Sequence, residues 1–455
     1  MVTSAEEAQT ALDAANPGDE IVLAEGSYAN FRVILSRNGT EEDPIVFRAE
    51  KGGAVTFTHN SGIQFRADHV VVDGFIFSSV PHMGVGSNVI AFENASHSKL
   101  VNCAFYRCGF EKWSHIIRII GNSQNCEVAW CYLEDIIGQG IGVTGSGNNT
   151  NNHIHHNRIN RTVSDGESNG QEPIQVGQNA RTQGKTYNRT VVEYNLIENM
   201  DGDCDPELIS NKSAGNIYRH NTFVGNRPGT NLTIRGGIDS LVEGNYFDGS
   251  GIRAYGSAHV IKGNYINNVE DGIIIPGGTG QGIDNSYAET FNCTIEANWI
   301  SGSSGRGVRI GGGGPGGTFL HDILVRENVV LADTGLMFYQ ERSDYSGIEW
   351  NGNIGKGDAQ LSNSYISTGV ELGEPPATEL PAPLTPDDVG PDWMRRKNWA
   401  HFPVEEDGKS VDTGSFIGWI DISLDPWIYN YALAVWLYLP ESLVSPTGAW
   451  AYVPG

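Results

Sequence analysis

The chain carries little positive charge for its size. Its 455 residues include 29 Lys and Arg against 54 Asp and Glu, which gives a formal net charge of −25. Nucleic-acid binding needs a basic surface, so this balance excludes nucleic acid as a partner. A polyanion is not excluded, because a local basic groove or a bound cation can hold an anion on an acidic protein.

Long apolar runs are missing as well. No stretch reaches the length of a membrane-spanning helix, so we expect no membrane span. The first residues, Met1 to Ser4, show neither a basic start nor an apolar segment, and no secretion signal is visible. The chain is then either cytoplasmic or a mature form whose signal has been removed. We expect the second, a secreted or periplasmic protein.

The six cysteines contain no CxxC pair, which argues against a zinc site. The interval from Cys103 to Cys126 is the same as the interval from Cys108 to Cys131. A repeat of that length would stack each pair on neighbouring coils. We expect these residues to be small side chains facing a core, with disulfides as the lesser alternative.

What the sequence does have is glycine, at 58 residues, and a recurring short pattern. The pattern is an apolar residue, any residue, a second apolar residue and then Asn, repeated at intervals that insertions lengthen in some copies. Its copies place Asn at 157, 195, 221, 245, 264, 298 and 328. Two strands flanking an Asn bend predict an all-β fold, a right-handed parallel β-helix, in which Asn adopts the left-handed conformation.

The composition divides the chain into three parts. Residues 1–365 are predicted to form the β-helix, and residues 4–15 a helix that caps its first coil. Residues 366–394 are rich in proline and read as a linker. Residues 395–455 hold repeated aromatic segments, typical of a small module of hairpins. Its aromatic rings could stack on sugars, but a small core built on Trp is the favoured interpretation.

The most informative residues lie between 201 and 235. Lys212 and Arg235 are separated by the same interval as the cysteine pairs, one coil length, so we expect them side by side. Strand alternation also puts Asp205 and Glu207 on a common face. Two carboxylates beside two cations can form a metal site with catalytic partners. A solvated ladder of salt bridges is the alternative.

Several segments resemble polysaccharide lyase family 6, which contains alginate lyases and chondroitinase B. The segment 209–213, Ile-Ser-Asn-Lys-Ser, looks like the family's lysine motif, and 205–207, Asp-Pro-Glu, stands where the family has two acidic ligands. The segment 232–235, Leu-Thr-Ile-Arg, is similar to its arginine motif. Weaker resemblances lie in segments 15–28, 169–172 and 251–259. Together they span residues 5 to about 350.

This resemblance implies β-elimination on a polyuronate, most naturally alginate, assisted by Ca²⁺. Asn169, Asp205 and Glu207 would hold the Ca²⁺. Lys212 would be the base and Arg235 would neutralise or protonate the leaving oxygen.

Substrate binding would fall to the surrounding coils. Arg253 would hold a substrate carboxylate, with Tyr255 against a sugar ring and Glu172 nearby.

The sequence departs from the family pattern at two positions. Asp205 is shorter than the usual Glu, and Gly236 stands where the family often has His. The role of that missing His would be supplied elsewhere, with His220 and His259 as candidates.

Other functions stay open. A chondroitin or dermatan-type chain is an alternative substrate. A β-helix glycoside hydrolase could use Asp203, Asp205 and Glu207, although no matching Asp-Asp or Gly-His-Gly arrangement is present. A non-catalytic carbohydrate-binding β-helix is the third possibility.

Overall fold

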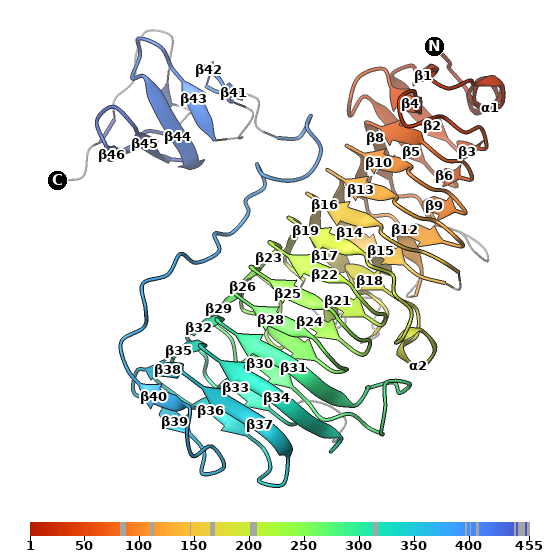
Figure 1. Ribbon diagram of the computed structural model, residues 1–455. Helices are drawn as coiled ribbons and strands as arrows, with labels where there is room; N and C mark the ends of the chain where they lie inside the picture. The colour runs from red at the N-terminus through yellow and green to blue at the C-terminus, as the bar shows by residue number, and fades with distance from the viewer. Residues whose placement is uncertain are drawn as a thin grey trace.

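The computed structural model is a long solenoid of three parallel sheets, followed by a small antiparallel module (Figure 1). The structure describes residues 1–81, 88–109, 113–145, 147–163, 169–200, 207–312, 317–395, 398–400, 402–405, 409–440, 443–444 and 451–452. Within this part of the chain, no helix is long and apolar enough to cross a membrane. The predicted parallel β-helix is confirmed.

Each coil contributes one strand to each of three sheets, named A, B and C here, so every strand pairs with those one coil before and after it. Sheet A consists of β1 (Glu20–Leu23), β4 (Ile45–Ala49), β7 (Val70–Asp73), β10 (Lys99–Val101), β13 (Glu127–Ala129), β16 (His153–His155), β19 (Val191–Glu193), β22 (Ile217–Arg219), β25 (Leu241–Glu243), β28 (Val260–Lys262), β31 (Thr290–Glu296), β34 (Leu320–Arg326) and β37 (Ser346–Asn351).

Sheet B follows sheet A on each coil after a sharp bend. It consists of β2 (Gly26–Ala29), β5 (Val55–Thr58), β8 (Phe75–Ser78), β11 (Ala104–Tyr106), β14 (Tyr132–Ile137), β17 (Arg158–Val163), β20 (Leu196–Glu198), β23 (Thr222–Val224), β26 (Tyr246–Asp248), β29 (Tyr265–Asn267), β32 (Trp299–Ser301), β35 (Val329–Leu331), β38 (Asn353–Lys356) and β40 (Val370–Leu372).

Sheet C completes each coil and carries the candidate site. It consists of β3 (Arg32–Leu35), β6 (Gly62–Phe65), β9 (Ile90–Glu93), β12 (His115–Ile120), β15 (Gln139–Val143), β18 (Ile174–Val176), β21 (Glu207–Asn211), β24 (Asn231–Ile234), β27 (Gly251–Ala254), β30 (Asp271–Ile275), β33 (Arg306–Ile310), β36 (Leu336–Gln340) and β39 (Gln360–Ser362).

The recurring Asn forms a continuous buried ladder at the bend from sheet A to sheet B. The side-chain amide of each Asn donates to the side-chain oxygen of the Asn one coil later, at 2.9 to 3.0 Å. The ladder joins Asn157, Asn195, Asn221, Asn245, Asn264, Asn298, Asn328 and Asn353. The prediction that Asn takes the left-handed conformation is wrong. The residue before it does, as at His156, Tyr194 and Gly244, because the Asn must point inward to bond along the stack.

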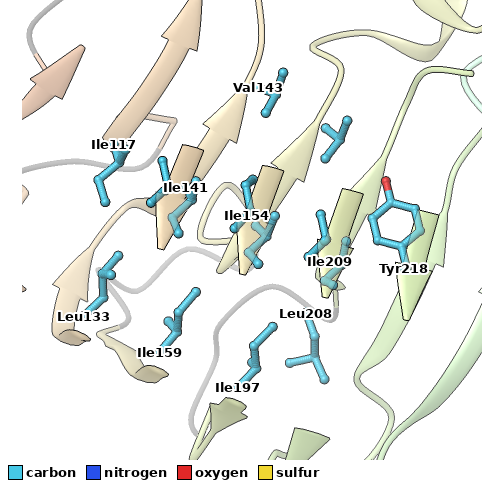
Figure 2. Packing of buried hydrophobic residues seen from close by; sticks show 14 of the residues in the cluster. Ile117, Leu133, Ile141, Val143, Ile154, Ile159, Ile197, Leu208, Ile209 and Tyr218 are labelled. Carbon is cyan, nitrogen blue, oxygen red and sulfur yellow. The ribbon is translucent and has the colours of Figure 1, made fainter. Parts of the chain in front are cut away.

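The interior is filled by rows of apolar side chains that stack from coil to coil, aliphatic in the middle coils and including stacked Phe rings elsewhere. Ile117, Ile141 and Ile209 from sheet C face Leu133 and Ile159 from sheet B, all fully buried, as Figure 2 shows. Strand alternation sends these residues inward and their neighbours outward. Burial of this kind is the main favourable term for the fold.

The cysteine pairing predicted from the equal intervals is wrong. In the register of β11 and β14, Ala104 lies opposite Tyr132, so Cys103 stacks on Cys131 over a coil longer than the predicted repeat. Cys126 lies opposite Ser98 instead. The expectation of small core residues is confirmed, since Cys103, Cys108, Cys126, Cys131 and Cys293 are all buried free thiols.

The first coil is capped as predicted. Helix α1 (Ala5–Ala14) begins after Ser4, whose side chain accepts a hydrogen bond from the Glu7 amide. Ala8 and Leu12 on one face of the helix are buried against the end of the core. The open end of the solenoid is thereby covered.

The proline-rich segment differs from a free linker. Its first part contains β40, which extends sheet B. Its later part runs back along the β-helix (Figure 1), where the amides of Leu384 and Gly390 donate to Thr222 and His156 at 2.8 Å. The Trp393 indole donates to the Asn102 carbonyl at 2.9 Å. These bonds hold residues 384–393 against the outside of the solenoid.

The C-terminal module has its own core. It contains a short pair, β41 (Asn398–Trp399) and β42 (Phe402–Pro403), and an antiparallel sheet of β43 (Ser410–Asp412), β44 (Trp419–Leu424), β45 (Trp427–Asn430) and β46 (Val435–Tyr438). The favoured interpretation of a core built on Trp is wrong. Of the described Trp residues in the module, Trp399 is buried, whereas Trp419, Trp427 and Trp436 are exposed because they alternate with the Ile and Leu that fill the core.

Candidate active site on sheet C

The predicted base and its partner lie side by side where two strands of sheet C end. Asn211 in β21 pairs with Ile234 in β24, so Lys212 and Arg235, the next residues, occupy equivalent places on neighbouring coils. Their backbones continue the ladder, with the Arg235 amide donating to the Asn211 carbonyl at 2.9 Å. Tyr255 follows β27 in the same way on the next coil. The one-coil separation of Lys212 and Arg235 is confirmed.

Glycine is required on the coil before Lys212. Gly177 has a positive φ of 85° and lies against the Lys212 backbone, where an added Cβ would come within 2.8 Å of a carbonyl carbon. Any other residue there would push the Lys212 backbone out of register. The close approach of Gly177 on the preceding coil therefore fixes the backbone position of Lys212.

A buried carboxylate lies between two arginines. Glu207 is only 4% exposed, and its Oε1 lies 3.2 Å from the Arg253 guanidinium and 3.8 Å from the Arg235 Nε. The Ser210 hydroxyl donates to the other carboxylate oxygen at 2.5 Å. Glu207 thus orients both arginine side chains on the outer surface of sheet C.

Lys212 faces a second carboxylate. Its side chain is 8% exposed, and its Nζ lies 3.6 Å from the Oε1 of fully buried Glu172. That oxygen has no hydrogen-bond partner within the described residues, whereas the other oxygen accepts from the Gln139 amide. Gln139 also donates to Gln175 at 3.0 Å. A fixed polar column therefore lies beside the lysine and holds it in one place.

An aromatic pair lines the other side of the arginine. The Arg235 guanidinium lies 4.8 Å from the centre of the Tyr287 ring, and Tyr287 contacts Tyr255 at 5.0 Å between ring centres. Tyr255 is fully buried, and this burial raises its pKa to about 12. Its ring packs against Tyr287 and is closed to solvent, so Tyr255 is not placed to stack on a sugar ring as predicted. Arg235 is restrained by a ring as well as by a carboxylate.

Gly236 stands where the resembling family often has His, and it is packed closely against two other residues. An added Cβ at Gly236 would lie 3.1 Å from the Cβ of Ala180, in helix α2 (Ala180–Gln183), and 3.5 Å from that of Ala288. These two elements fill the space that a larger side chain would need. A side chain at this position would require Ala180 to shift by a few tenths of an ångström.

Neither histidine considered as its replacement reaches the site. His259 is fully buried, with one ring nitrogen accepting from the Ser240 amide and the other 3.0 Å from the Tyr255 carbonyl. It positions the backbone of Tyr255. His220 lies at the bend between sheets A and B, stacked on Tyr194. Both predicted substrate contacts are wrong, because sequence distance does not tell which bend a residue occupies.

The three predicted Ca²⁺ ligands are only partly described. Asp205 lies outside the described residues, and Asn169 is exposed on the segment that leads to Glu172. Glu172 and Glu207 lie two residues before Ile174 and Ile209, which pair in register on neighbouring coils, but their carboxylates contact different groups: Lys212 and Gln139 for Glu172, the two arginines for Glu207. The carboxylate oxygens of Glu172 and Glu207 and the amide oxygen of Asn169 are of the kind that a hard cation such as Ca²⁺ takes as ligands.

Sequence reasoning missed Tyr287, Ser210 and Gln139. Ser210 lies in the lysine motif and faces outward by simple alternation, so it could have been found. Gln139 and Glu172 lie far apart in sequence, because an insertion lengthens that coil, and Tyr287 lies on a loop outside the repeat. No periodic pattern points to either of them.

Comparison with known proteins identifies the family of the chain. The family model described as Chondroitinase B matches residues 2–303. Among solved structures, the PL6 family alginate lyase AlyGC is 25% identical with a TM-score of 0.70, covering 86% of this chain and 58% of the other. A PL6 family polysaccharide lyase from Pseudopedobacter saltans is 21% identical with a TM-score of 0.65, covering 86% and 99%.

A curated relative is also found. The uncharacterized protein YclG of Bacillus subtilis is 32% identical over 177 residues, 38% of this chain and 26% of YclG. The chain thus spans about a quarter of YclG and less than two thirds of AlyGC.

Proposed function

Because the chain belongs to the Chondroitinase B family, polysaccharide lyase family 6, we propose that it cleaves an acidic polysaccharide by β-elimination. The observation that carries the proposal is the gathering of Arg235 and Arg253 at Glu207 on one face of sheet C, with Lys212 beside Glu172 in the place equivalent to Arg235 on the preceding coil. This patch places three cations together on a chain of net charge −25. Such a patch favours an anionic substrate.

The residues divide the reaction between them. β-Elimination needs a base for the proton on C5 of the uronate and charge compensation at the leaving oxygen on C4. Lys212, nearly buried and held beside Glu172, accepts the C5 proton through its amine. Arg235, fixed by Glu207 and Tyr287, stabilises the negative charge on the leaving oxygen. Arg253 binds a uronate carboxylate.

A Ca²⁺ ion is part of the proposal. Asn169, Asp205 and Glu207 would hold it, and the ion would compensate the negative charge that develops on the substrate carboxylate. Glu172 would add negative charge to the surroundings through the buried oxygen that faces Lys212. The protein groups alone still position the base and the leaving group.

Alginate is the proposed substrate, because the similar solved structure AlyGC is described as a PL6 family alginate lyase. We place the protein outside the cytoplasm, secreted or periplasmic, where such polymers would be met. A chondroitin or dermatan-type chain remains the second candidate, since the matching family model bears the name Chondroitinase B.

The test is a panel of defined polyuronates and glycosaminoglycans, with ultraviolet absorbance of the unsaturated product as the readout. Rising absorbance on polymannuronate or polyguluronate supports alginate cleavage, and rising absorbance on dermatan sulfate alone transfers the proposal to that substrate. Reducing ends formed without absorbance would indicate a hydrolase instead.

A further inference from the structure

The C-terminal antiparallel sheet has two chemically different faces. Its inner face packs Ile420, Ile428 and Leu437 at 0 to 4% exposure. Its outer face carries rings exposed by 38 to 49%, those of Trp419, Trp427, Tyr431, Trp436 and Tyr438. The module therefore has a core of aliphatic side chains and Trp399, and leaves other large aromatic rings in solvent. An exposed aromatic surface of this kind marks a binding site.

The rings of this aromatic face support one another. Trp427 contacts Tyr438 at 5.2 Å between ring centres, and Tyr429 contacts Trp436 at 5.3 Å. Tyr429 also meets Tyr431 edge-on at 5.4 Å. Rings held in this way lose little freedom when a ligand binds, which lowers the entropic cost of binding.

The charge of the aromatic face indicates which class of ligand it can bind. Among the described residues of its four strands, the charged side chains are Asp412 and Asp421, and none is basic. Sheet register puts Asp412 opposite Trp419 and Asp421 opposite Tyr429, so both carboxylates belong to the aromatic side. A polyuronate would be repelled here, in contrast to the cationic patch on sheet C.

We propose that the aromatic face binds an uncharged polysaccharide, independently of the elimination site. The C–H faces of neutral pyranose rings are weakly positive and match the negative faces of Trp and Tyr. The two carboxylates can accept hydrogen bonds from sugar hydroxyls. The protein then carries two sites of opposite preference, one for an acidic chain and one for a neutral glycan.

The experiment uses the full chain. Wild type is sedimented with insoluble cellulose, chitin and β-1,3-glucan, and is run through gels containing soluble alginate. We expect wild type to sediment with at least one neutral glycan. Trp427→Ala and Trp436→Ala should each weaken that binding by about tenfold, and the double variant should abolish it. Tyr365→Ala, at a ring on the β-helix that is 49% exposed against 38% for Trp427 and Trp436, is the control and should bind normally.

Elimination by the Trp variants on short soluble oligouronates should equal that of wild type, which separates this site from the one on sheet C. Melting curves check folding, and Trp427→Phe, which keeps a ring, should retain most of the binding. The proposal is overturned if no neutral glycan binds. It is also overturned if the Trp variants lose retention by alginate gels instead, or if the face captures only protein partners.

Discussion

At the scale of residues, the site depends on restraint of the cationic side chains. Lys212 is nearly buried beside Glu172, and Arg235 is held between Glu207 and Tyr287. An exposed lysine or arginine would have to be ordered by the substrate at an entropic cost. Here the fold has already placed them.

Replacement of Lys212 should stop elimination without unfolding the protein. Lys212→Ala removes the base, and Lys212→Arg should not rescue it, because a guanidinium stays protonated. We expect elimination to fall by about 10²-fold or more in both. The measurement is the initial rate on a polyuronate with a melting curve for each variant. Lys262→Ala, at a half-buried ion pair on sheet A, is the control. A normal elimination rate for Lys212→Ala would mean that Lys212 and its charged neighbours form only a ladder of salt bridges.

Removal of Ca²⁺ should lower both activity and thermal stability. A chelator would leave Glu207 and its neighbours without the proposed ion, so the melting temperature should drop and recover when Ca²⁺ is added back. Asp205→Asn should need more Ca²⁺ for the same melting temperature. Full activity and an unchanged melting curve in the chelated protein would refute the metal role.

His259 should make the protein sensitive to acid. Burial lowers its pKa from 6.5 to about 4, so the unfolded chain binds a proton that the folded chain does not. Above pH 6.5 the titration of His259 does not change the free energy of unfolding. As the pH falls from 6.5 towards 4, this free energy decreases by about 3 kcal/mol at most. Urea unfolding at several pH values measures it. His259→Gln should flatten that part of the profile, and an unchanged slope would contradict the assignment.

At the scale of elements, the Asn ladder determines how coils follow one another. Asn245 donates to Asn264 and to the Tyr218 carbonyl, and its oxygen accepts from Asn221. Asn245→Ala would leave several buried groups without partners, so we expect a loss of roughly 2–4 kcal/mol. Denaturant unfolding measures the change. Asn351→Ala, at an exposed position, should cost little, and equal losses in both would mean that the ladder is not structural.

Prediction from sequence succeeded where coil length is constant. The lysine and arginine motifs lie on short neighbouring coils, so their spacing gave the true register. The same spacing failed for the cysteines, because the coils that carry them are longer. Period alone does not reveal an insertion. For the same reason, the residues near Lys212 that come from lengthened coils, Gln139 and Tyr287, could not be found.

At the scale of the whole molecule, the amino-acid sequence predicted the solenoid and its cap but not the arrangement of the C-terminal part. Proline content suggested a linker, yet residues 384–393 follow the surface of the β-helix. Aromatic content suggested a Trp core, yet alternation along β44 to β46 turns those rings outward. Composition tells which residues are present in a segment, and only register tells which face they occupy.

The fate of water in the cleavage tests the central claim most directly. A defined oligouronate is digested in water labelled with heavy oxygen, and the product masses are measured. Elimination at Lys212 adds no water, so we predict one unsaturated product, lighter than the hydrolysis product by one water, and no label in either fragment at the moment of cleavage. Two saturated fragments whose masses sum to the substrate plus one water, with no unsaturated fragment, would show hydrolysis and contradict the account.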